Sequence, residues 1–250
     1  MTSSAKAMAR PVPPLPAWED IPPGSADELA KARTELLNLA QWLARMANSY
    51  VGGMPQDRVV LRLDSRAPSF VTQPFEHDVA LEIRLPDLEM QFLEAGKRVP
   101  HIFNPEEHSP AKVEAWLLVE LLHRGIDRTK FSKQLPYNMS NLMTGDAEDH
   151  APQECTAGLA QLAAWYRNAG AALGLMHDSG RLWVHPQTLH LSLAAKPGDA
   201  SSAGFSPGND EHPEPHFYRN GKKRVILSAA ELARESNPAA AASRFLSENI

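Results

Sequence analysis

The 250-residue chain has a single cysteine, Cys155. One thiol forms neither an internal disulfide nor a site built from several thiolates. Cysteine-rich structural zinc sites and iron–sulfur clusters within one chain are therefore excluded. A lone cysteine also fits a reducing compartment, so we expect a cytoplasmic protein in which this thiol is an ordinary small residue.

Long apolar runs are also absent. The longest, at residues 115–122 (AWLLVELL), contains Glu120 and is too short to span a bilayer. The first 20 residues contain prolines where a secretory signal peptide needs an uninterrupted apolar stretch. We therefore expect a protein that neither enters a membrane nor is exported.

Positive charge is not in excess, because 25 Lys and Arg residues stand against 30 Asp and Glu residues, for a formal net charge of −5. A broad cationic surface that neutralises several phosphates is excluded, so no nucleic-acid partner is expected. Glycine-rich phosphate loops are missing too, and we expect no cofactor. A short basic segment contains Arg124, Arg128, Lys130 and Lys133, but Asp127 lies among them, which favours a solvated charge cluster over an anion site.

Proline and apolar spacing divide the chain in two. Residues 1–24 contain six prolines, which predicts a flexible or extended arm whose Trp18 can pack onto the body of the protein. Residues 25–250 are predicted to form a single domain. Apolar residues recur there every three or four positions in three long stretches and every second position in others. We predict helices at 26–50, 110–123 and about 153–174, strands at 59–63, 79–85, 88–92 and 182–193, a hairpin around Asn220 and Gly221, and short helices starting at Ser228 and Asn237.

Helices and strands do not alternate regularly in this prediction. The turn at Pro86 and Asp87 favours an antiparallel hairpin between two of the strands. The predicted fold class is therefore α+β, with a mainly antiparallel sheet covered by three longer helices and closed by short C-terminal helices.

Residues 204–218, GFSPGNDEHPEPHFY, contain the Gly-x-Ser-x-Gly pattern of a nucleophile elbow. In such an elbow the backbone N–H of the residue after the serine helps to bind an oxyanion. Here that residue, after Ser206, is Pro207, which has no N–H. Pro213 and Pro215 also prevent the helix that has to follow. We therefore interpret this pattern as a structural turn.

The same segment offers three metal ligands, His212, Glu214 and His216. These side chains share one face if the backbone is extended. Pro213 and Pro215 instead favour polyproline geometry, which spreads the side chains around the axis. A solvated acidic loop is the favoured interpretation, and no metal site is predicted.

Other histidines give less information. His185 and His190 differ in parity on a regular strand, so they face one pocket only if Pro186 introduces a bulge. Five further histidines lie near helix ends or in loops, where solvated or capping roles are common. These residues, to which no function is assigned, are His101, His108, His123, His150 and His177.

Residues 204–208 (GFSPG), followed by Glu214-Pro215 and Phe217-Tyr218, resemble a bacterial family of uncharacterised proteins classed as a domain of unknown function. Its members carry a Gly-Phe-Ser-Pro-Gly segment that leads to Glu-Pro-aromatic-Phe-Tyr. Residues 35–50, 76–97 and 109–127 resemble its early helix, central hairpin and next helix. The resemblance covers most of residues 26–247 and implies a fold more than an activity.

One departure from the family concerns its polar residues. Where members often have Trp-Pro-His-His-Phe-Asp, residues 185–190 of this chain are HPQTLH. Pro186 matches, whereas Gln187, Thr188 and His190 replace two histidines and an aspartate. If the family's cluster is a metal or acid/base site, the resemblance implies that this chain has altered it.

Two functional hypotheses follow, beside a purely structural role for all these residues. The first is a small-molecule binding or interaction protein with a pocket where strand 182–193 meets the 204–218 loop. Its polar contacts would come from Gln187, Thr188, His190, Glu214 and Tyr218. The alternative is a hydrolase that binds a metal or moves protons with Glu214 and the histidines at 185, 190, 212 or 216.

Overall fold

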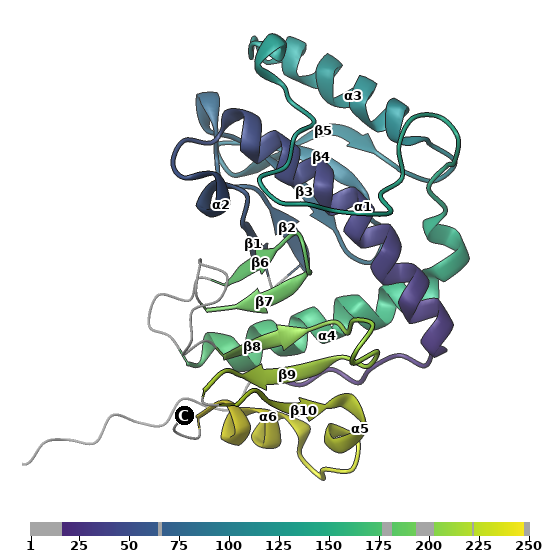
Figure 1. Ribbon diagram of the computed structural model, residues 1–250, viewed down its shortest axis with the longest axis vertical. Helices are drawn as coiled ribbons and strands as arrows, with labels where there is room; N and C mark the ends of the chain where they lie inside the picture. The colour runs from purple at the N-terminus through teal and green to yellow at the C-terminus, as the bar shows by residue number, and fades with distance from the viewer. Residues whose placement is uncertain (1–16, 65–66, 177–181, 194–202, 222, 248–250) are drawn as a thin grey trace, which may run out of the picture.

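The protein is described by a computed structural model in which ten strands form one sheet (Figure 1). The strand order is β10-β9-β8-β7-β6-β1-β2-β3-β4-β5, and each neighbouring pair is antiparallel. The predicted α+β class with an antiparallel sheet is confirmed. The structure describes residues 17–64, 67–176, 182–193, 203–221 and 223–247.

Six α-helices and ten strands lie within these described residues. The helices are α1 (Ala26–Tyr50), α2 (Pro55–Arg58), α3 (Pro110–His123), α4 (Thr156–Gly174), α5 (Ala229–Leu232) and α6 (Pro238–Ser247). The strands are β1 (Leu61–Asp64), β2 (Ser69–Val71), β3 (Val79–Arg84), β4 (Met90–Glu94), β5 (Lys97–Phe103), β6 (Trp183–His185), β7 (His190–Ser192), β8 (Ala203–Ser206), β9 (His216–Arg219) and β10 (Val225–Ser228).

The sheet consists of two five-stranded meanders. Strands β1 to β5 run outward from the centre in one direction, and β6 to β10 run outward in the other. The meanders join where β1 pairs with β6, with Leu61 opposite Val184. A long helix precedes each meander, α1 the first and α4 the second, and these two helices pack against each other. The halves therefore share an order of elements, although no repeat is visible in the sequence.

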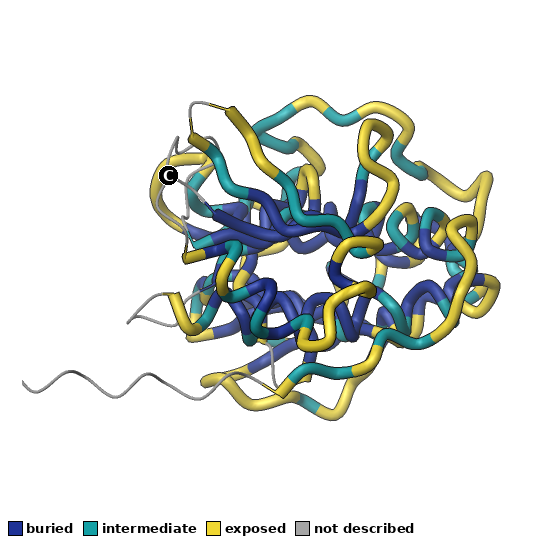
Figure 2. The backbone as a smooth tube through the Cα atoms, turned by 90° about the horizontal axis from the view of Figure 1, so that it is seen from below, coloured by how far each residue is buried: buried dark blue, intermediate teal, exposed yellow. Residues whose placement is uncertain are grey.

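One face of the sheet is apolar and packs against the helices. Because side chains alternate along a strand, Leu81 and Ile83 on β3 and Leu191 on β7 point to the same face as Phe205 and Phe217. All five are fully buried. The buried residues of the sheet and of the helices form two facing layers in Figure 2. This leaves the opposite face for polar side chains, among them those of the candidate site.

The helices begin close to the predicted positions, because the N-cap residues that mark a helix start lie within a few residues of it. Ser25 forms a capping box with Glu28, and Ser228 forms one with Glu231. Ser109 caps α3, with Pro110 at its first position. The third long helix begins at Thr156 rather than near residue 153, because a 3-10 helix occupies Pro152–Cys155.

Two differences from the expected strands and one confirmed hairpin bear on the site. The strand predicted at 182–193 is a hairpin of β6 and β7, whose turn contains Pro186. The interpretation of residues 204–208 as a turn is wrong for its first part, because β8 extends through Ser206 and the chain turns only afterwards. The Asn220 hairpin between β9 and β10 is confirmed, with a longer connection than a two-residue turn.

The C-terminal part of the predicted arm lies against α4. Trp18 contacts the rings of Trp165 and Phe217, with centroid separations of 6.3 and 6.4 Å. The backbone of Glu19 exchanges two hydrogen bonds with the side chain of Asn168, of 2.8 and 2.9 Å. Residues 1–16 of the arm lie outside the described residues. None of the helices described is long and apolar enough to cross a membrane.

Candidate functional site

A cavity of about 430 Å³ opens beside the β6–β7 turn. Its wall comes from that turn, from β9 and the connection after it, and from segments next to α2 and residue 137. The described residues that line it are Gln56, Val59, Val60, Pro136, Tyr137, His185, Pro186, Gln187, Thr188, His190, Ser192, Tyr218, Asn220 and Arg224.

The β6–β7 hairpin brings two histidines to one wall. His185 and His190 lie directly opposite each other across the hairpin, so their side chains point to the same face. Pro186 allows this by lying in the turn between two strands, not by forming a bulge within one. The Nε2 atom of His185 lies 3.0 Å from the hydroxyl of Ser192, also on the wall. The shared pocket considered from the sequence therefore exists.

Tyr218 forms a second wall of the cavity and contacts two other lining residues, His190 and Arg224. Its ring lies 5.4 Å from that of His190, and the guanidinium of Arg224 lies 4.5 Å from its centroid. Its hydroxyl end lies over Gly204 on the neighbouring strand, where a Cβ atom would meet the hydroxyl oxygen at 2.5 Å. Glycine is required at that position because a Cβ atom would also collide with the backbone oxygen of Leu191, which cannot move aside.

Two titratable side chains of the cavity, His190 and Tyr218, are uncharged near pH 7. Burial lowers the pKa of His190 to about 4, and the positive charges of Arg224, His216 and His185 lower it in the same direction. Burial raises the pKa of Tyr218 to about 12. Among the described lining residues there is no Asp or Glu, and Arg224 is the only one with a permanent charge.

The β6–β7 turn, which contains Gln187 and Thr188, is fixed by hydrogen bonding to Gln41, a fully buried residue of α1. The Gln41 amide donates to the backbone oxygen of Pro186 at 2.8 Å, and its oxygen accepts from the Tyr137 hydroxyl at 2.8 Å. Sequence reasoning missed this residue. No local signal distinguished it, because α1 is amphipathic and has other polar side chains, Asn38 and Arg45, three and four residues away.

Four of the five residues predicted for the site line this cavity: Gln187, Thr188, His190 and Tyr218. Glu214 does not. It lines a different hollow of about 630 Å³, together with Trp18 and Trp165. Its carboxylate accepts from the backbone N–H of Ala230 at 3.4 Å. Because Glu214 precedes β9, its direction is not set by the strand alternation that places Tyr218.

The hypothesis of a metal site at residues 212–216 finds no geometric support. The rings of His212 and His216 are 5.4 Å apart, but Nδ1 of His216 contacts the backbone oxygen of Glu214 at 2.9 Å. The Glu214 carboxylate points toward α5 instead. Among the described residues, the one group of three His, Cys, Asp or Glu side chains close enough to share an ion contains none of these.

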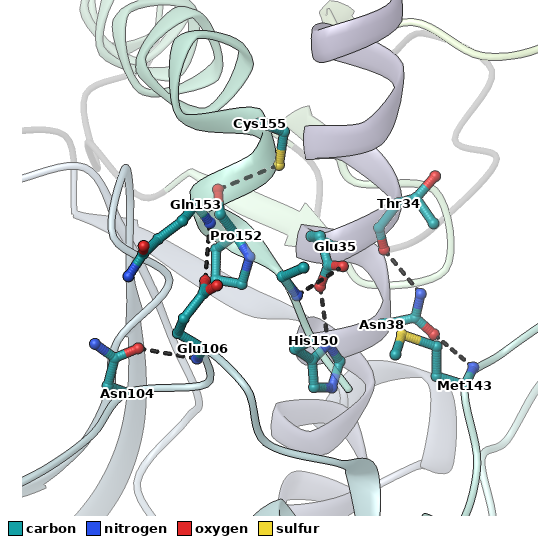
Figure 3. Close-up of polar contacts among 11 residues, drawn as sticks. Thr34, Glu35, Asn38, Asn104, Glu106, Met143, His150, Pro152, Gln153 and Cys155 are labelled. Atoms are coloured by element: carbon teal, nitrogen blue, oxygen red, sulfur yellow. Dashed lines mark hydrogen bonds and ion pairs between the residues drawn. The ribbon is translucent and has the colours of Figure 1, made fainter. Parts of the chain in front are cut away.

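Cys155, His150 and Glu35 lie near one another between α1 and the start of α4 (Figure 3). Nδ1 of His150 is 2.8 Å from the Glu35 carboxylate, while the Cys155 thiol donates to the oxygen of Pro152 at 3.5 Å. Burial raises the pKa of the thiol to about 11, with a further contribution from Glu35. A thiol with such a pKa is a poor nucleophile. The contacts of Glu35 with His150 and with the backbone N–H of Ala151 connect α1 to the segment before α4.

Fold and cavity together define an α+β protein with one polar, carboxylate-free cavity at the β6–β7 turn among its described hollows. Comparison with family models, curated proteins and solved structures found no match for the chain.

Proposed function

We propose that the protein binds a small organic anion in the cavity at the β6–β7 turn. The observation that carries this proposal is the charge arrangement. Arg224 stacks on Tyr218 over a wall of uncharged donors and acceptors, and no carboxylate opposes it among the described lining residues. A carboxylate or phosphate group would gain a charge-assisted hydrogen bond from Arg224 there, with no carboxylate of the described lining to compete for the guanidinium.

The cavity also suits a ligand with a polar or unsaturated body. About 430 Å³ lies within the usual range for small-molecule sites, roughly 300–1,000 Å³. His190 and Tyr218 offer ring faces, and the Gln187 amide and Thr188 hydroxyl offer hydrogen bonds at the exposed turn. Gln41 keeps that turn in place, which lowers the entropy cost of ordering it on binding.

Binding has more support than hydrolysis. A general base works best with a pKa near the working pH, whereas that of His190 is about 4. Tyr218, with a pKa of about 12, is correspondingly too weak an acid to donate a proton readily. His185 and Ser192 are within hydrogen-bond reach, as a base and a hydroxyl nucleophile are, but no carboxylate among the described lining residues orients the imidazole. These groups are suited to hydrogen bonding with a ligand that remains unchanged.

The proposal is tested by calorimetric titration of the protein with a panel of carboxylates and phosphate monoesters. For a ligand that binds, Arg224→Gln should weaken binding about tenfold or more, the loss of one charge-assisted hydrogen bond of about 1.5 kcal/mol. Gln187→Ala should weaken it less. Glu214→Ala is the matched control, because Glu214 lines another hollow, and should leave affinity unchanged.

Two results would contradict this function. One is a panel in which no anion binds. The other is a ligand whose affinity falls as much in Glu214→Ala as in Arg224→Gln, which would place the ligand elsewhere.

We also propose that the chain belongs to the uncharacterised family that it resembles. The residues of the resemblance have defined places in this fold: Gly204 lies under Tyr218, and Phe205 packs against Phe217 with ring centroids 5.6 Å apart. The altered residues, Gln187, Thr188 and His190, line the cavity. A structure of an established member with the same strand order would support the assignment, and a different order would refute it.

A further inference from the structure

Two histidines and a glutamate from different elements converge at one end of the sheet. His101 lies on the edge strand β5, while Glu120 and His123 lie in the last turn of α3. The Glu120 carboxylate is 4% exposed, whereas the two histidine side chains are 67% and 57% exposed. The carboxylate therefore lies at the bottom of an open hollow, with an imidazole on each side.

The spacing of these groups matches that of ligands around a tetrahedral ion. Nδ1 of His101 and Nδ1 of His123 lie 3.4 and 3.6 Å from the same oxygen, Oε1 of Glu120. Zinc bonds of about 2.0–2.1 Å at tetrahedral angles separate neighbouring ligand atoms by about 3.3–3.4 Å. The ligand atoms of all three residues lie within 4.8 Å of one another. Small side-chain rotations would therefore complete such a site.

The other carboxylate oxygen of Glu120 is already oriented. Oε2 accepts from Arg124 at 2.7 Å, and Arg124 is held over the Phe92 ring at 4.4 Å and beside Glu94 at 3.1 Å. Metal-binding carboxylates commonly have such an outer partner, which fixes the direction of the free oxygen. Glu94 and Glu120 together also outweigh the charge of Arg124, so the hollow favours a cation.

The local sequence explains why α3 presents this arrangement. Glu120 and His123 are three residues apart and therefore lie on one helical face. His123 is the last residue of α3, where the partial negative charge of the helix end attracts a cation. The partner on β5 is distant in sequence, so spacing along the chain did not indicate it.

We propose that His101, Glu120 and His123 bind Zn²⁺, with the remaining coordination position open to water. Two imidazoles and a carboxylate form a ligand set that zinc accepts, and three protein ligands leave one position free. This proposal departs from the sequence analysis, which predicted no metal site. The site lies where β5, at the outer edge of the first meander, meets the end of α3, and it shares no residue with the lining of the cavity at the β6–β7 turn.

The test is calorimetric titration of the chelator-treated protein with Zn²⁺, repeated with Co²⁺ followed by visible absorption. One ion per chain is expected, together with the intense absorption of tetrahedral Co²⁺. His101→Ala and His123→Ala should each weaken Zn²⁺ binding at least about tenfold, the loss that even outer partners of a metal site cause. The control is His212→Ala, which removes an exposed histidine elsewhere and should bind as the parent does.

Thermal unfolding in the presence of chelator shows whether a variant has lost only a metal ligand or has also lost stability of its fold. Because both histidines are largely exposed, their variants should unfold with the parent midpoint when no metal is present. The proposal is overturned if the parent protein does not bind Zn²⁺, or if His212→Ala weakens binding as much as His101→Ala and His123→Ala.

Discussion

His190 makes the stability of the fold depend on pH. Its pKa is about 4 in the folded protein, against 6.5 for an ordinary histidine. When pH falls below 6.5, the unfolded chain takes up this proton first, so folding loses free energy. The contribution is fully present above pH 6.5 and is lost as the pH falls to about 4. We expect a loss of about 1–3 kcal/mol, allowing for the partial exposure of the ring.

Urea unfolding of the parent and of His190→Gln between pH 4 and 7 measures this effect. The variant should lose less stability on acidification. Part of the dependence will persist, because burial also lowers the pKa of His216. Parallel curves for the parent and His190→Gln would contradict the prediction.

Single residues were predictable from the sequence where strand alternation fixes their direction. Tyr218 on β9 and His190 on β7 face the cavity for that reason. Glu214 and Arg224 lie outside the strands, so their directions depend on the path of the connecting chain. Glu214 was consequently predicted for this cavity although it lines another hollow. Arg224, which has the permanent charge of the cavity, was not considered for the site.

At the scale of elements, the packing of α1 against α4 depends on Gly158, where the backbones of the two helices come close together. A Cβ atom on Gly158 would collide with the backbone of Glu28 and Leu29 on α1, which cannot move aside as a side chain does. Gly158→Ala should therefore destabilise the protein by about 1–3 kcal/mol through overpacking. Denaturant titration with far-ultraviolet circular dichroism measures this change.

Gly174, the last residue of the same helix, provides the control. A Cβ atom there meets nothing within 4 Å. Gly174→Ala should be neutral or stabilise by up to about 1 kcal/mol, because alanine restricts the unfolded chain and favours helix. Equal effects of the two substitutions would show that the helices do not approach as closely as described.

Helices and strands were predicted well when their capping residues and apolar pattern extend over one long, continuous stretch of sequence. The three longer helices have caps and apolar stripes that occur within one stretch of sequence. The missed strands lack such signals: β2 has three residues, β8 begins next to Gly204, and Pro100 interrupts β5. Proline in β5 is tolerated because β5 is an edge strand, and this position is known only once the sheet order is known.

At the scale of the whole molecule, we expect residues 25–250 to unfold in one transition. The β1–β6 pairing makes the sheet continuous, and α1 and α4 pack across the junction between the meanders. Tryptophan fluorescence and circular dichroism should give coincident curves. Val184→Ala, a buried change at the junction, should lower the midpoint without splitting the transition. Two resolved transitions would show that the halves fold separately.

The order of the strands was beyond prediction from the sequence. Each meander follows from hairpins between consecutive strands, but the contact of β1 with β6 joins residues more than a hundred positions apart. Nothing in the short runs around Leu61 and Val184 specifies that pairing. It depends on which faces α1 and α4 bury together, which is a property of the assembled core.

The two outward-running meanders give the chain the topology of a two-fold dimer within one polypeptide. In a homodimer, every substitution appears in both subunits, so a site away from the axis is made twice. Joining the halves covalently removes that constraint. Among the described residues, the histidine–glutamate cluster occurs at the outer end of the first half, while the carboxylate-free cavity lies near the junction, where the β6–β7 turn faces residues 56–60 before β1. The single chain can therefore place a different chemistry at each of two positions in one architecture.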